Sequence, residues 1–174
     1  IEQKVGAFYA SGMDEATVKA RNAYTEGTFG HNALLVDGKP QIARAATITG
    51  FAQTAALSCV TGDASDCYGP AVALWRRHIA SVAPEYYAIF DELRTDGAAR
   101  SVDLLLHTTP EGRFTVRDAA LKVDEQRVAG EARVVGAGGE ALVRFVGANP
   151  TFTHGRWPAC EDYGHFLKVS FAPA

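Results

Sequence analysis

Short runs of β-forming residues, separated by turn signals at regular intervals, constrain the fold of this chain more than any other feature. The runs are rich in Val, Ile, Thr, Phe and Tyr, which fit a pleated sheet. Between them lie clusters of Gly, Pro, Asn and Asp, which favour turns. The predicted strands are Glu2–Tyr9, Ala33–Val36, two runs within Thr47–Thr61 that break near Gln53, Val72–Val82, Tyr86–Leu93, Val102–Thr108, Arg113–Arg117, Ala119–Val123, Arg127–Val135, Ala141–Val146 and His165–Phe171.

The segments between these runs show little sign of helix. Ser11–Arg21 is predicted as a polar connection with one helical turn, and Gly147–Tyr163 as a long irregular segment. No apolar stripe at helical spacing persists for more than about two turns. Many short strands with turns between them are typical of an antiparallel sandwich. We therefore predict an all-β fold, an antiparallel multi-stranded β-sandwich, as one domain over residues 1–174.

Composition and charge exclude several classes of protein. The chain is 47% apolar and 21% charged, which are ordinary values for a globular domain. Its formal net charge of -3 argues against a nucleic-acid coat, although a local basic patch still leaves an anionic ligand open. No apolar stretch approaches the roughly 20 residues that span a bilayer. We expect neither a nucleic-acid nor a membrane partner.

The cysteines limit the number of disulfides, and the first residue indicates whether the chain is part of a longer protein. Cys59, Cys67 and Cys160 allow at most one disulfide and have no CxxC spacing. Cys59 lies in an apolar run, where a thiol behaves as a small hydrophobe. The chain begins at Ile1, inside what reads as structured sequence, and no signal peptide is visible. We expect it to be a mature piece or an excised domain of a longer protein.

The stretch Gly27–Gln41 is the first candidate site. His31 and Asn32 precede the apolar run Ala33–Val36, and a strong hairpin signal, Asp37-Gly38, follows. A side chain at the mouth of a rigid strand is held ready for chemistry or for a metal, but a lone histidine also serves structure. A metal needs further ligands, and the available ones have no diagnostic spacing: Asp14, Asp37, Asp63, Asp66, His78 and His107.

Two further clusters carry candidate residues. In Trp75–His78, strand alternation places Trp75 and Arg77 on one face and the pair Arg76 and His78 on the other. Either one face offers a guanidinium to a carboxylate while the other packs, or the run is a solvated edge strand with Trp75 covering the core. In Gly62–Tyr68, the aspartates either cap a turn or bind a hard cation. Aromatic groups suited to proton transfer or to stacking on a sugar ring, or simply to the core, are Tyr24, Tyr68 and Trp157.

Five blocks in order resemble one known family. The runs GHNALLVDGKPQ, GDASDCYGP, RRHI, YYAIFDEL and DLLLHTTPEG, which span about residues 22–112, are similar to the C-terminal β-sandwich domain of heparinase II/III-like polysaccharide lyases, a group that includes oligoalginate lyases. The resemblance implies a larger enzyme with an α/α toroid before this domain and a substrate cleft between the two. Such lyases cleave uronate polysaccharides by β-elimination, with the main base and acid on the toroid.

The resemblance also implies roles for particular residues. His31 matches a family histidine that lines the cleft or binds zinc, Asp14 stands for an aspartate ligand, and Tyr24 matches a tyrosine that some members bring from this domain. The family's His-x-Asp strand has no counterpart, since no histidine precedes His31. With the clusters above, the predicted catalytic residues are His31 and Tyr24, the metal ligands are His31 and Asp14 for zinc, and the substrate-binding residues are Asn32, Arg76, His78, Tyr68 and Trp157.

The resemblance finally implies a substrate and a location. The substrate is an acidic polysaccharide or oligosaccharide, alginate-like or heparin/heparan-like, and the isolated domain is expected to be inactive because the toroid is missing. We expect a periplasmic or secreted bacterial protein, or a cytoplasmic one if it acts on oligosaccharides. The alternative function is a non-catalytic carbohydrate-binding or structural β-sandwich module.

Overall fold

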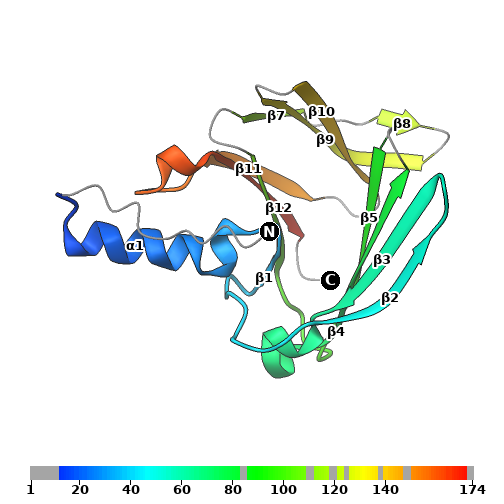
Figure 1. Cartoon of the computed structure of the whole chain (residues 1–174), viewed down its shortest axis with the longest axis horizontal. Coiled ribbons are helices and arrows are strands. Elements are labelled where there is room, and N and C mark those ends of the chain that lie inside the picture. Colours follow the sequence, from blue (N-terminus) through cyan, green and yellow to red (C-terminus); the bar gives the residue numbers. More distant parts are fainter. Residues whose placement is uncertain are drawn as a thin grey trace. The chain divides into compact units, whose positions relative to one another are not determined.

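The computed structural model describes residues 12–82, 86–108, 112–117, 121–123, 126–136, 139–146 and 150–171. The chain divides into two compact units, which are described separately (Figure 1). The first unit comprises Ile1–Pro40 and Ser101–Pro173, and the second comprises Gln41–Arg100 with Ala174. The single domain predicted over residues 1–174 stays a prediction.

The first unit contains the only α-helix among the described residues and most of the strands. Its elements are α1 Glu15–Thr25, the 3₁₀ helices η1 Thr28–Gly30 and η3 Glu161–Tyr163, and strands β1 Leu34–Val36, β6 Val102–His107, β7 Arg113–Arg117, β8 Leu121–Val123, β9 Gln126–Gly136, β10 Gly139–Val146, β11 Thr151–Arg156 and β12 His165–Phe171. One sheet has the order β1-β6-β12-β11, and the other the order β10-β9-β7 with β8 beside β9.

The core of the first unit lies between these two sheets. Strand β12 alternates so that Leu167 and Val169 are fully buried, and Leu104 and Leu106 of β6 stand opposite them in the antiparallel register. Phe114 from β7 of the other sheet packs into the same cluster. Burying such apolar faces against each other is what holds a two-layer β-structure together. Every described strand pair is antiparallel, so the predicted all-β sandwich is confirmed.

Strand β1 and its turn follow the sequence pattern closely. The apolar run Ala33–Val36 is buried, and Leu34, Leu35 and Val36 are each at most 4% exposed. Asp37 and Gly38 both have positive φ, at 51° and 67°, and Val36 and Lys39 exchange main-chain hydrogen bonds across them. This is the two-residue hairpin turn that an Asp-Gly pair favours, because its twist matches that of the flanking strands.

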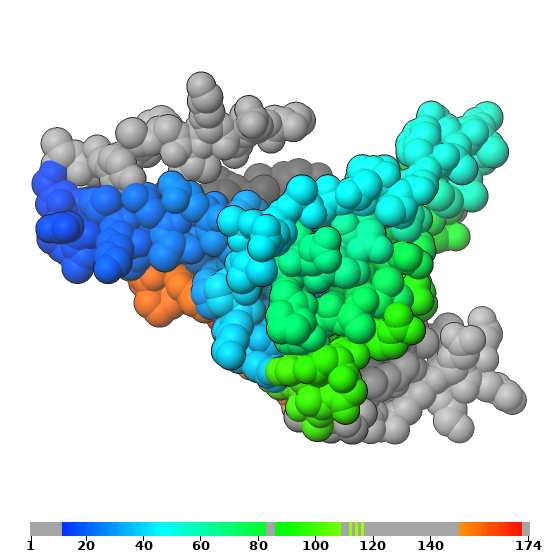
Figure 2. Space-filling model, turned by 90° about the horizontal axis from the view of Figure 1, so that it is seen from below, coloured from blue at the N-terminus to red at the C-terminus, as the bar shows by residue number. Residues whose placement is uncertain are grey.

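The second unit is a four-stranded antiparallel sheet. Its elements are β2 Thr47–Gln53, β3 Leu57–Asp63, η2 Ser65–Ala71, β4 Val72–Val82 and β5 Tyr86–Thr95, with the strand order β2-β3-β4-β5. The predicted break near Gln53 is confirmed, because Thr54 Oγ1 accepts the main-chain N–H groups of Ala56 and Leu57 in the turn. Every residue of β2, cyan in Figure 2, is exposed.

Two sequence predictions in the first unit are wrong. Ser11–Arg21 is not a connection with one helical turn, because α1 runs over Glu15–Thr25 with Asp14 as its N-cap. The segment Gly147–Tyr163 is not irregular throughout, since β11 occupies Thr151–Arg156 and pairs with β12. The predicted strand Glu2–Tyr9 lies outside the described residues. None of the helices that the structure describes is long and apolar enough to cross a membrane.

Candidate functional site

The end of α1 and the start of β1 are joined by an unusually close turn. A Cβ atom at Gly27 would lie 2.3 Å from the carbonyl oxygen of Ala23, and one at Gly30 would lie 2.4 Å from that of Tyr24. Only glycine fits such an approach, because real side-chain carbons do not come so near to main-chain oxygen. The main-chain N–H of His31 then donates to the carbonyl of Thr28 at 3.2 Å. The two glycines therefore fix the position of His31 relative to the end of α1.

Asn32 connects this turn to the end of β6. Its Oδ1 accepts the main-chain N–H of His107 at 2.8 Å and lies 3.3 Å from Nδ1 of the same residue. Strands β1 and β6 are already neighbours, with Leu34 opposite Leu104. The sheet register thus brings the His31–Asn32 pair next to a second histidine that is far away in the sequence.

An aromatic cluster lies beside His107. The Tyr24 ring meets the imidazole edge-on, with centroids 6.0 Å apart, and stacks on Trp157 at 5.8 Å. Phe29 lies 5.1 Å from Trp157 on the same measure. Tyr24 is only 5% exposed, and burial raises its pKa to about 12. Its hydroxyl therefore keeps its proton at neutral pH, which suits a proton donor better than a base.

The two histidines of this region differ in environment. His31 is exposed, whereas Nε2 of His107 is buried and makes no hydrogen bond within the described part of the chain. Burial lowers the pKa of His107, the nearby Phe29 carbonyl opposes this, and the charge of His31 lowers the pKa further. A buried imidazole that resists protonation is neutral near pH 7.

The loop that carries Trp157 is fastened to α1 by one arginine. Arg21 donates from Nε to the carbonyl of Ala159 at 2.9 Å and from its terminal nitrogen to Asp162, and its guanidinium lies over the Tyr163 ring. Ala159 has a φ of 62°, a conformation that costs a non-glycine residue energy and needs support from its surroundings. The loop position is therefore enforced by α1.

We expect Arg21→Ala to destabilise the loop and lower the free energy of unfolding by about 1–2 kcal/mol, because a carbonyl and a partly buried packing surface lose their partner. The exposed Asp162 adds little to this sum. Chemical denaturation followed by Trp157 fluorescence, in a Trp75→Phe background, measures the loss. Arg21→Lys, which keeps the charge without the planar fork, should recover less than half of it; full recovery by lysine would show that charge alone holds the loop.

Four sequence-predicted residues and one further residue come together here. We use the name His107 cluster for the following set: Tyr24, His31, Asn32, His107 and Trp157. The sequence treated His107 only as one of several available metal ligands, and nothing in its spacing pointed to Asn32. The signal that could have found it was its place at the end of the predicted strand Val102–Thr108.

The remaining predicted substrate-binding residues lie in the second unit. Arg76 forms an ion pair with Asp63 at 2.9 Å, and His78 Nδ1 lies 3.0 Å from Thr61 Oγ1. Asp63 Oδ1 also accepts from the N–H and hydroxyl of Ser65, so the turn interpretation of this aspartate is confirmed. Tyr68 is buried and meets Trp75 edge-on at 5.2 Å. Substrate binding by these residues stays a prediction.

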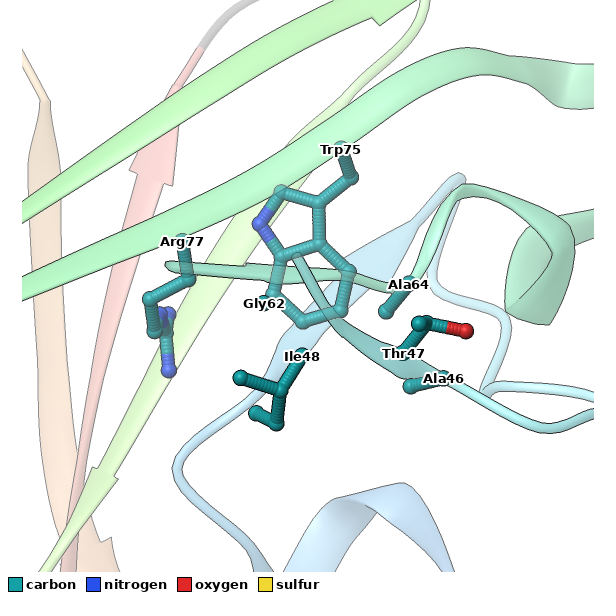
Figure 3. Close-up of a pocket in the computed structure, with 7 residues that line it drawn as sticks. All are labelled: Ala46, Thr47, Ile48, Gly62, Ala64, Trp75 and Arg77. Atoms are coloured by element: carbon teal, nitrogen blue, oxygen red, sulfur yellow. The ribbon is translucent and has the colours of Figure 1, made fainter. Parts of the chain in front are cut away.

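A small cavity opens on the Trp75 face of this sheet. It measures about 150 Å³, and Figure 3 shows Trp75 and Arg77 on the same side of β4, facing Ile48 of β2. Asp91 holds the Arg77 guanidinium with two hydrogen bonds, at 2.7 and 2.8 Å, and also accepts from the Trp75 indole at 3.3 Å. Asp91 thus neutralises the positive charge of Arg77 within the sheet, so this charge is not left over to bind an anionic ligand.

The predicted zinc site receives no support from the donor set. Both carboxylate oxygens of Asp14 accept from Thr17, one from its N–H and one from its hydroxyl, as the cap of α1. Within the described residues, no three His, Cys, Asp or Glu side chains are grouped to hold a metal ion. Cys59, Cys67 and Cys160 are free. The residues present do not make a complete site, and zinc held by His31 and Asp14 stays a prediction.

Comparison with known proteins places the chain in a family. The sequence model of the heparinase II/III-like C-terminal domain matches residues 5–165, a span that includes the His107 cluster and all the described strands except β12, of which it covers only the first residue. A comparison with curated proteins finds no match. With the antiparallel sandwich in view, the match over most of the chain shows that it belongs to the heparinase II/III-like C-terminal family, a family of polysaccharide lyases.

Proposed function

We propose that this chain is the β-sandwich domain of a lyase that cleaves a uronate-containing polysaccharide by β-elimination, and that the His107 cluster forms one wall of its substrate cleft. One observation carries the proposal. An exposed histidine and a neighbouring asparagine are held just before the start of β1, against a second histidine and an aromatic cluster that includes Trp157. Imidazole, amide and stacking surface are the groups that a charged sugar ring requires.

The chemistry explains what this wall has to do. A base removes the proton from C5 of the uronate, the C5 electron pair forms the C4–C5 double bond, and the C4–oxygen bond breaks as the leaving oxygen takes up a proton. Negative charge develops on the uronate carboxylate during this step, so fixed donors lower the barrier. His31 and Asn32 would act as such donors, and Trp157 as a stacking surface. The main base and acid would come from an α/α toroid in the same protein.

The substrate within this class is an alginate-like polymer or oligomer, with a heparin/heparan-like glycosaminoglycan as the second candidate. The proposed location is the periplasm or the exterior of a bacterial cell. The described residues around His31 do not complete a zinc site, so the roles given above are those of the side chains themselves. Tyr24 would act with its hydroxyl protonated, as a hydrogen-bond donor and not as a base, because burial raises its pKa to about 12.

The proposal predicts a difference between the whole protein and this chain alone. The full-length polypeptide should form an unsaturated product from an alginate or heparan substrate, seen as a rise in ultraviolet absorbance. The present chain alone should give no rise above the substrate blank, because proton abstraction needs groups that it does not supply. Robust activity of this chain by itself would contradict that division of labour.

The alternative, a non-catalytic carbohydrate-binding module, predicts different effects of substitutions at the same residues. Binding of uronate oligosaccharide to the chain would then survive His31→Ala and be lost with Trp157→Ala, because stacking alone would carry the affinity. With no product from the full-length polypeptide, this binding pattern would replace the lyase proposal.

A further inference from the structure

The hydrogen bonds between β1 and β6 end in an unusual way. Main-chain N–H groups of β6 donate toward β1, and Leu105 gives its N–H to the carbonyl of Ala33 at 2.9 Å. Two residues later, His107 gives its N–H to the side-chain Oδ1 of Asn32 at 2.8 Å. An amide oxygen thus takes the place of a strand carbonyl. Because a main-chain N–H only donates, this contact identifies the Asn32 atom as oxygen and puts its amide nitrogen on the side away from His107.

The imidazole of His107 adds a second contact to the same oxygen. Its Nδ1 lies 3.3 Å from Asn32 Oδ1, and an amide oxygen only accepts, so Nδ1 carries the hydrogen in a neutral ring. Nε2 is then the nitrogen with the lone pair, and it is buried without a hydrogen bond in the described part of the chain. The edge-on Tyr24 ring restricts how the imidazole can turn.

We propose that His107 is a positioning residue, whose main-chain N–H and imidazole Nδ1–H together hold Oδ1 of Asn32 and so fix the face that His31 and Asn32 present to substrate. The consequence for catalysis rests on the proposed lyase function. A donor held before the reaction need not reorganise as charge develops, whereas a freely turning amide would point its oxygen toward the uronate carboxylate part of the time.

Three substitutions in the full-length polypeptide separate the contacts of the His107 side chain. His107→Phe keeps a ring against Tyr24 but removes both nitrogens. His107→Asn puts an amide nitrogen near the position of Nδ1, and His107→Gln puts one near that of Nε2. The expected result is a loss in kcat of about 10- to 100-fold for Phe and for Gln, with KM changed less than about threefold. Asn should rescue most of this loss.

A histidine outside the cluster supplies the matched control. His154 is exposed on β11 of the same unit, so His154→Phe should leave kcat unchanged. A direct readout of the tautomer comes from nitrogen NMR of the ¹⁵N-histidine-labelled protein. The resonances that disappear in His107→Phe should show hydrogen on Nδ1 and none on Nε2.

Two results would overturn the assignment: wild-type kcat in both the Phe and the Gln variant, or resonances that place the hydrogen on Nε2. If the Phe variant does not fold, the Gln variant still supplies the kcat test, and the resonances that disappear in His107→Gln identify those of His107 in the wild type. Absence of lyase activity in the wild type would instead refute the proposed function, while the tautomer would still decide whether His107 holds Asn32.

Discussion

Gly30→Ala is expected to destabilise the first unit by about 3 kcal/mol, the upper end of what overpacking costs. The new Cβ would lie 2.4 Å from the carbonyl oxygen of Tyr24, an atom of the rigid main chain at the end of α1. Relief requires the turn to move away from the helix. That movement would separate His31 and Asn32 from His107, so structure and site should fail together.

Urea denaturation followed by tryptophan fluorescence measures this effect, in a Trp75→Phe background that leaves Trp157 as the reporter. The first unit contains Trp157 and the second contains Trp75, so the signal comes from the unit that carries the change. Gly155→Ala on β11 of the same unit is the matched control, since its Cβ would lie 3.8 Å from the Phe166 ring and should change stability by about 0.5 kcal/mol or less. Equal unfolding midpoints for the two variants would contradict the close turn.

The strands of this protein were largely predictable because their signals are local. The Asp37-Gly38 pair fixes its own turn through positive φ, and the apolar run before it is buried as its composition indicated. The break after Gln53 and the bounds of β4 at Val72 and Val82 also follow from neighbouring residues. Such features depend on residues that are close in sequence, which is what sequence patterns record.

Helix α1 and strand β11 escaped prediction for a physical reason. Tyr24 is the only buried residue of α1, so no apolar stripe with helical spacing is visible, and the Asp14 cap was the available signal. Strand β11 reads Thr-Phe-Thr-His-Gly-Arg, and most of its residues are exposed. Its strand structure comes from pairing with β12 and not from its own composition.

The candidate site was predictable in part. His31, Asn32, Tyr24 and Trp157 were selected from local chemistry and from the resemblance, but their meeting with His107 depends on sheet register. Asn32 and His107 are 75 residues apart, and a shift of one residue in the β1–β6 pairing would turn the imidazole to the other face. No single sequence pattern contains that information.

His31→Ala in the full-length polypeptide is the second large effect that we expect. The imidazole of His31 is exposed, and it adjoins the half-buried His107, whose pKa is lowered by burial. Removing one positioned donor from a site of developing negative charge costs about 10²-fold in turnover. His154→Ala, on the exposed β11 of the same unit, is the matched control and should keep the wild-type rate.

The decisive measurement is the rate of ultraviolet absorbance increase when full-length wild-type, His31→Ala and His154→Ala proteins act on an alginate or heparan substrate, with metal content determined on the same samples. The proposed lyase function predicts unsaturated product from the wild type and the His154 variant, and a rate about 100-fold lower for the His31 variant. A His31→Ala protein with unchanged rate and unchanged metal content would contradict the assignment of His31 to the wall of a lyase cleft.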